Sequence, residues 1–255
     1  MKRVLHVSDP HLRRGERRSE PGWRALQAFV RADPPALVVD TGDLVFDSPE
    51  ATDDHLFAAA CHGELGVDVV LVPGNHDIGD CQPNADGPRD VLGTAFAALH
   101  GPSHWVRHIE DWALVGVNAL LFGSGRPAEA AEWRWFEAAL QGNQAHPIAL
   151  FVHKPPFLVH PDEIERSSAV MPEAGRSRFW SLVKRHDVRL IGCGHRHEYR
   201  SVLADGVLIV WAPTTSALLD ETTAPLPAQA HSGLVEYLFS GGSVVHRPVI
   251  LRAMP

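Results

Sequence analysis

Residues 3–11 read RVLHVSDPH, a mostly aliphatic run, Arg3 to Val7, that ends at Asp9-Pro10-His11. Four more apolar runs are followed by polar residues in the same way: 36–39 before Gly42-Asp43, 67–72 before Gly74-Asn75-His76-Asp77, 148–152 before His153, and 188–191 before Gly194-His195-Arg196-His197. Such runs are typical of strands covered on both faces. Because ligands in α/β proteins gather beyond the carboxyl ends of the strands, the five polar segments are predicted to meet in space.

The rest of the chain predicts the other elements of an α/β fold. Helical spacing of apolar residues occurs at 22–33, 52–65, 88–99, 128–140 and 175–186. Further strands are predicted at 112–118, 199–203, 207–212, 233–239 and 243–250, with turns at Asp205-Gly206 and Gly241-Gly242. A four-layer αββα sandwich of two mixed β-sheets flanked by helices accounts for this order. The length of 255 residues fits one domain that spans 1–255.

Seven side chains in the polar segments are candidate metal ligands: Asp9, His11, Asp43, Asn75, His153, His195 and His197. Imidazoles, carboxylates and an amide oxygen suit Mn, Fe, Zn, Co or Ni ions, and the segments contain no cysteine for a structural thiolate site. Asp9 and His11 stand two residues apart, and so do His195 and His197. An extended backbone would therefore point both side chains of each pair to the same side. Pro10 is expected to bias Asp9 toward that extended region. The pattern predicts a catalytic centre with two divalent metal ions, whose natural use is phosphoryl chemistry.

Over residues 4 to 212, the order Asp-x-His, Gly-Asp, Gly-Asn-His-Asp, His and Gly-His-x-His resembles the calcineurin-like metallophosphoesterase superfamily. The resemblance implies one metal ion held by Asp9, His11, Asp43 and His197, and a second held by Asp43, Asn75, His153 and His195, with Asp43 as the bridge. It also implies that His76 is catalytic: His76 faces the phosphate and stabilises charge or protonates the leaving oxygen, while a metal-bound hydroxide attacks phosphorus. The versions of the motifs at 74–79 and 153–157 are similar to a broad group that includes cyclic-nucleotide phosphodiesterases and protein phosphatases.

Two departures from the family pattern concern the second acidic residue and the substrate. Relatives often carry a second acidic residue three positions after the bridging one, whereas Asp47 stands four positions after Asp43. This spacing bears against Asp47 as the residue that orients His76. Cyclic-nucleotide members frequently have an arginine soon after the Asn-His-Asp motif, and this chain has Ile78-Gly79-Asp80 instead. That difference weakens an assignment to cyclic nucleotides.

Three stretches beside the motifs, 12–22, 78–89 and 155–176, lack clear periodicity and are predicted to form the walls of the substrate pocket. Arg14 in the first stretch and Arg89 in the second are the candidate cations for a substrate phosphate. Asn75 and His76 are expected to contact the same group.

Composition limits the partners. The chain has 23 basic and 31 acidic residues and a formal charge of -8, which disfavours binding to a nucleic-acid backbone. It reaches a predicted strand by residue 3, which leaves no room for a signal peptide, and no apolar run approaches the roughly 20 residues of a membrane span. The three cysteines show no paired spacing, as is usual in a reducing compartment. We therefore expect a cytoplasmic protein that acts on a small phosphate ester.

Four functions stay open on the sequence alone. The first is hydrolysis of phosphodiesters or phosphomonoesters, and the second is a protein serine/threonine phosphatase of the same fold. A DNA nuclease is disfavoured by the acidic balance. A non-catalytic scaffold is disfavoured because an inactive fold has no physical need for all seven candidate ligands.

Overall fold

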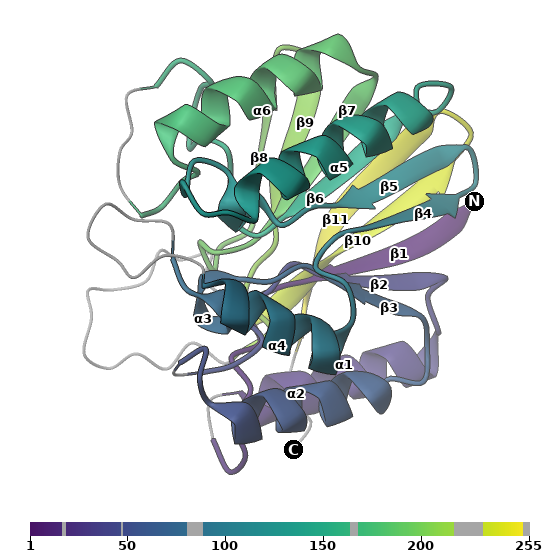
Figure 1. The fold of residues 1–255 in the computed structure, drawn as a ribbon. Coiled ribbons are helices and arrows are strands. Elements are labelled where there is room, and N and C mark those ends of the chain that lie inside the picture. The colour runs from purple at the N-terminus through teal and green to yellow at the C-terminus, as the bar shows by residue number, and fades with distance from the viewer. Residues whose placement is uncertain (17–18, 47, 81–88, 164–167, 217–231, 252–255) are drawn as a thin grey trace.

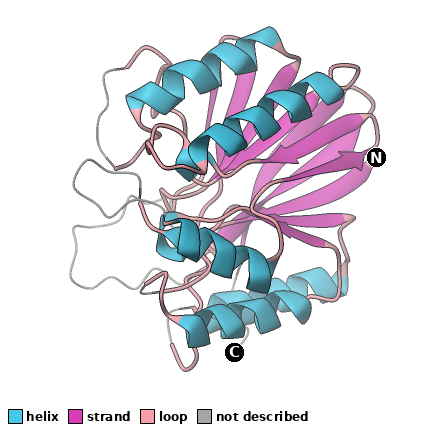
Figure 2. Cartoon of the chain, viewed as in Figure 1, coloured by secondary structure: helices cyan, strands magenta, loops and turns pink. Residues whose placement is uncertain are grey.

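Two β-sheets pack face to face at the centre of the protein (Figures 1 and 2). The structure is a computed structural model that describes residues 1–16, 19–46, 48–80, 89–163, 168–216 and 232–251. The first sheet has the order β11-β10-β1-β2-β3, formed by β1 (Lys2–Val7), β2 (Leu37–Asp40), β3 (Val69–Leu71), β10 (Gly233–Ser240) and β11 (Ser243–Ile250). The second has the order β4-β5-β6-β7-β9-β8, formed by β4 (Trp105–Ile109), β5 (Trp112–Gly116), β6 (Ile148–Val152), β7 (Val188–Cys193), β8 (Arg200–Ala204) and β9 (Val207–Trp211). Both sheets combine parallel and antiparallel neighbours.

Helices cover the outer face of each sheet (Figure 1). The first sheet is covered by α1 (Glu20–Ala32), α2 (Thr52–Gly63) and α4 (Asp90–His100). The second is covered by α5 (Glu129–Gly142) and α6 (Glu173–Arg185). Two short elements, α3 (Asn75–Ile78) and the 3-10 helix η1 (Ala119–Leu121), follow β3 and β5. The predicted four-layer αββα sandwich is confirmed.

Three clusters of buried side chains fill the spaces between these layers. Leu26 of α1 belongs to the cluster beneath the first sheet's helices, Phe136 of α5 to the one beneath the second sheet's helices, and Tyr237 to the one between the sheets. Neighbouring residues of β1 pack in different clusters: Leu5 faces the helices, whereas Val4 faces the opposite sheet. Side chains alternate along a strand, so a strand buried on both faces has a continuous apolar run.

The carboxyl ends of the parallel strands of both sheets lie at one edge of the sandwich, away from the start of the chain (Figure 1). Hydrogen bonds join the two sheets there: the Thr215 N–H donates to the Ser8 carbonyl at 3.0 Å, and His153 Nδ1 lies 2.8 Å from the Thr41 carbonyl oxygen. This edge therefore holds the loops that carry the predicted ligands.

Within the described ranges, every helix is too short or too polar to cross a membrane. Cys61 and Cys193 are buried free thiols. Cys81 lies outside the described residues.

Candidate metal centre

The structure brings all seven predicted ligands together beyond the carboxyl ends of five strands. Asp9 and His11 follow β1, and the others stand after β2, β3, β6 and β7 in the order Asp43, Asn75, His153, His195 and His197. Backbone hydrogen bonds join these loops: the Asp9 N–H donates to the Gly42 carbonyl at 2.9 Å, and the Gly194 N–H donates to the His153 carbonyl at 2.9 Å. The strand ends therefore converge as the sequence predicts.

The extended backbone expected for the two paired-ligand segments is wrong. Asp9 has φ 52°, His11 44°, His195 67° and His197 55°, which are all left-handed, so Pro10 does not hold Asp9 in the extended region. Left-handed backbone is uncommon outside glycine and costs on the order of 1–3 kcal/mol per residue. With Asp43, five of the seven described non-glycine residues with positive φ are candidate ligands. Tertiary contacts at the site therefore override the local preference.

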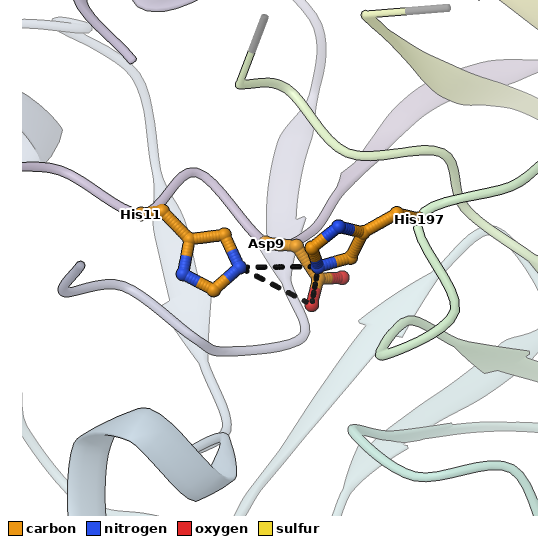
Figure 3. A group of neighbouring side chains, drawn as sticks. All are labelled: Asp9, His11 and His197. Carbon is orange, nitrogen blue, oxygen red and sulfur yellow. Dashed lines mark hydrogen bonds and ion pairs between the residues drawn. The ribbon is translucent and has the colours of Figure 1, made fainter. Parts of the chain in front are cut away.

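The first ligand group consists of Asp9, His11 and His197, whose donor atoms converge (Figure 3). Asp9 Oδ1 lies 3.2 Å from His197 Nε2 and 4.0 Å from His11 Nε2, and the two Nε2 atoms lie 3.1 Å apart. Asp9 Oδ1 is buried and contacts His197 Nε2 as an ion pair, but it accepts no hydrogen bond of good geometry. A buried carboxylate oxygen normally accepts a hydrogen bond, and a cation placed among these three atoms would satisfy it instead.

The second ligand group surrounds His153. Its Nε2 lies 3.4 Å from Asp43 Oδ2, 3.0 Å from Asn75 Oδ1 and 3.2 Å from His195 Nδ1. Asp43 also has a carboxylate oxygen within 4.8 Å of donor atoms of His11 and His76. It therefore lies between the two groups, where the bridging role implied by the family resemblance requires it.

Backbone carbonyls orient the rings of three candidate ligands: His11 Nδ1 faces Val45 O at 3.3 Å, His153 Nδ1 faces Thr41 O at 2.8 Å, and His195 Nε2 faces Ser168 O at 2.8 Å. A carbonyl oxygen only accepts, so the ring nitrogen that faces it carries the proton, and in a neutral ring the other nitrogen has the free lone pair. His11 and His153 thus present Nε2 to the centre and His195 presents Nδ1. Ser168 belongs to the predicted wall 155–176, so this wall contacts a candidate ligand.

His76 lies beside both ligand groups. Its Nδ1 is 2.9 Å from the Phe46 carbonyl oxygen, and its backbone N–H donates to Asp43 Oδ1 at 2.8 Å. Its ring meets the His11 ring edge-on, with centroids 4.9 Å apart. A backbone carbonyl thus orients the ring, and Asp47 lies outside the described residues.

Asp77 has a structural role that the sequence analysis missed. Its buried carboxylate accepts the N–H of Gly74 at 2.7 Å and the N–H of Leu44 at 2.8 Å, and thereby ties the loop after β2 to α3. The signal for this role is an acidic residue three positions after the glycine that precedes a short helix, which is the spacing of a capping box. Gly74 leaves no room for a side chain, since a Cβ there would lie 2.2 Å from Asp43 N.

Burial and charge shift the pKa values of several site residues in opposite directions. Burial alone would lower the pKa of His153, but the adjacent Asp43 carboxylate outweighs it and raises this pKa to about 9. Burial and the nearby charge of His153 lower the pKa of His195 to about 3. Burial opposes ionisation of Asp9, yet the His197 imidazole holds the pKa of that carboxyl below its usual range. Opposed shifts within one cluster are characteristic of functional sites.

The donor set fits two divalent ions. It offers two ionised carboxylates, one amide oxygen and four imidazole nitrogens, a mixture that borderline divalent ions prefer. Two dications would retain a net positive charge among these ligands, and a phosphate would be attracted to it although the whole chain carries -8.

The two arginines assigned to substrate phosphate make other contacts in the structure. The Arg14 guanidinium lies over the Phe57 ring of α2, 5.2 Å from its centroid. Arg89 precedes α4 and forms an ion pair with Glu50. Neither contact consumes all five N–H donors of a guanidinium. Their assignment to the substrate stays a prediction.

Comparison with known proteins gives the family. The model of the calcineurin-like phosphoesterase family matches residues 2–199. The chain belongs to the calcineurin-like phosphoesterase family. A probable glycerophosphodiester phosphodiesterase of Arcobacter nitrofigilis is 25% identical over 71% of this chain and 64% of the relative. A 3',5'-cyclic adenosine monophosphate phosphodiesterase of Vibrio vulnificus is 24% identical over 84% of this chain and 76% of the relative. The chain thus spans less than two thirds of the length of the first of these family members.

Solved structures support the fold of this calcineurin-like phosphoesterase. A dimetal phosphatase from Danio rerio superposes with a TM-score of 0.66 at 14% identity, covering 99% of both chains. The purple acid phosphatase PPD1 of yellow lupin gives a TM-score of 0.70 at 15% identity, covering 98% of this chain and 51% of that one. At these identities the likeness establishes the shared architecture.

Proposed function

We propose that this protein hydrolyses phosphodiesters with the help of two divalent metal ions. One observation carries the proposal: seven candidate ligands beyond the ends of five strands fall into two groups, with Asp43 between them. Asp9, His11 and His197 would hold one ion, and His153, His195 and Asn75 the other. When bound, such a pair activates water and neutralises the charge of a phosphoryl group.

The chain's own residues would bind and orient the substrate. His76, held at Nδ1 by the Phe46 carbonyl, would present Nε2 to the reacting phosphate and would stabilise its charge or give a proton to the leaving oxygen. Asn75, Arg14 and Arg89 are the proposed phosphate contacts. The whole chain, 1–255, is proposed to be one domain. A cytoplasmic location is proposed from the few free cysteines.

The choice of diesters rests on two observations. The curated relatives described above carry phosphodiesterase names. After the Asn-His-Asp motif, where cyclic-nucleotide members frequently have an arginine, this chain has Ile78-Gly79-Asp80, and the Asp80 carboxylate accepts from Lys154 Nζ at 2.5 Å. The missing arginine removes one cation that would attract a nucleotide phosphate, and the ammonium of Lys154 is engaged by Asp80, so simple diesters are favoured over cyclic nucleotides.

A panel of substrates tests this choice. Bis-p-nitrophenyl phosphate, p-nitrophenyl phosphate, 3',5'-cyclic and 2',3'-cyclic nucleotides and phosphopeptides are assayed with manganese, iron and zinc in turn. The expected result is activity on the simple diesters, with slower turnover of the cyclic nucleotides. Rapid turnover of a phosphopeptide with the diesters inert would make the protein a phosphatase, and inactivity on the whole panel with both metal ions bound would favour a scaffold.

A further inference from the structure

A chain of buried polar side chains connects the centre of the sandwich to Asp9. It begins at the Tyr237 hydroxyl of β10, which lies 3.4 Å from His6 Nδ1 of β1, and continues from His6 Nε2 to Thr41 Oγ1 at 3.0 Å. Thr41 Oγ1 donates to Ser8 Oγ at 2.8 Å, and Ser8 Oγ donates to Asp9 Oδ2 at 2.5 Å. All five residues have 0% of their surface exposed.

Two glycines, one in β7 and one directly after it, make room for this chain of side chains. A Cβ on Gly192 of β7 would lie 3.0 Å from His6 Cε1, and a Cβ on Gly194 would lie 1.8 Å from Ser8 Oγ. A larger residue at position 194 would therefore displace the serine hydroxyl. The lack of side chains at Gly192 and Gly194 thus leaves space for the polar side chains of His6 and Ser8.

The charge of Asp9 determines where each proton of the chain lies. The ionised carboxylate only accepts, so the single hydroxyl proton of Ser8 points to it. Thr41 then gives its own proton to Ser8, and His6 has to donate from Nε2 to Thr41 Oγ1. A neutral imidazole has one N–H, so His6 Nδ1 accepts from Tyr237. Burial lowers the pKa of His6 to about 3, which keeps this ring neutral.

Thr41 also reaches the second ligand group. Its carbonyl oxygen lies 2.8 Å from His153 Nδ1, while its hydroxyl belongs to the chain that ends at Asp9. Asp9 Oδ2 further accepts the backbone N–H of His195 at 2.9 Å. With Oδ2 held by these two donors, the carboxylate can turn only Oδ1 toward His11 and His197.

We propose that Tyr237, His6, Thr41 and Ser8 form a one-directional hydrogen-bond relay that positions the Asp9 carboxylate for metal binding. The relay rests on the metal role proposed for Asp9. Hydrogen bonds that all point the same way polarise one another, so the negative charge of Asp9 is stabilised more than by one hydroxyl alone. The partners of metal ligands contribute in this way, and their loss typically costs 10–100-fold in metal affinity.

Thr41→Val and Thr41→Ser separate a relay from simple packing. Valine keeps the shape of threonine but removes the hydroxyl, whereas serine keeps the hydroxyl and removes a methyl group. The relay predicts that manganese affinity, measured by calorimetry on the metal-free protein, falls about 10–100-fold in Thr41→Val and stays within about threefold in Thr41→Ser. A packing role predicts the reverse order, which would overturn the proposal. Thermal unfolding of both metal-free variants confirms that each is folded.

A second measurement needs neither metal nor activity. Imidazole nitrogen NMR of the metal-free protein should show His6 as the neutral tautomer with its proton on Nε2. A proton on Nδ1, or a charged ring at neutral pH, would contradict the relay. Because affinity and tautomer are measured without substrate, a wild-type protein that binds manganese but hydrolyses no phosphate ester would refute the proposed function and leave this test intact.

Discussion

Replacing Asp43 by asparagine tests the shared carboxylate while it keeps the shape of the side chain. In the structure Asp43 Oδ1 accepts the backbone N–H of His76 at 2.8 Å, and an amide oxygen can accept the same bond. The other oxygen lies 3.4 Å from His153 Nε2. The substitution therefore removes one negative charge from the centre without removing the loop contact.

The magnitude follows from that charge. Two unit charges about 4 Å apart interact by about 4 kcal/mol at an effective dielectric constant of about 20. A divalent ion carries two such charges, so the loss is at least about 10³-fold in affinity for each ion that Asp43 contacts. At a manganese concentration tenfold above the wild-type dissociation constant, occupancy of Asp43→Asn would fall to about 1% or less, so hydrolysis should be nearly abolished.

Metal content by mass spectrometry and hydrolysis of bis-p-nitrophenyl phosphate are measured on the same samples. Asp68→Asn is the matched control, because that carboxylate is 57% exposed and lies in an ion pair with Arg107 rather than at the centre. The control should keep both metal content and turnover. Two bound ions and undiminished turnover in Asp43→Asn would refute the bridging role.

Three further predictions concern His76, His153 and Arg89. His76→Ala should keep both metal ions, while its kcat falls by roughly 10²–10⁴-fold. Metal content is measured by mass spectrometry, and loss of metal in this variant would make His76 a ligand. Asp43 raises the pKa of His153 to about 9, so the ion pair adds to the free energy of unfolding at pH 6.5 and below. This contribution is lost as the pH rises from 6.5 through 9. Thermal unfolding of the metal-free protein should show the loss, about 3 kcal/mol in size, and constant stability would contradict it. Arg89→Leu should raise KM about tenfold or more, whereas Glu50→Gln breaks the same ion pair and should not; equal KM values would remove Arg89 from the substrate site.

The order of elements and the convergence of the five motifs could be predicted because burial on both faces leaves a strong sequence signal. The edge strand β4 was not predicted, since Arg107 and His108 lie exposed within it and dilute the apolar pattern. The left-handed backbone at Asp9 also could not be predicted. Its hydrogen bond to the loop after β2 comes from residues distant in the sequence, and these contacts override the local influence of Pro10.

The sequence did not predict the relay residues His6 and Thr41 for a related reason. His6 and Thr41 stand within or directly after apolar runs, where one polar residue does not change the strand pattern. Their roles depend on contacts across 35 and 231 residues of sequence. The available signal was a polar side chain inside a strand buried on both faces, because a buried polar group has to find a hydrogen-bond partner.

Titration of the metal-free protein with manganese, while hydrolysis of bis-p-nitrophenyl phosphate is followed, tests the central claim most directly. The two ligand groups predict that activity is absent without metal, rises as ions bind, and reaches its plateau at two manganese ions per chain. Full activity in the metal-free protein, or two bound ions without hydrolysis of any phosphate ester, would contradict the proposed two-metal phosphoesterase.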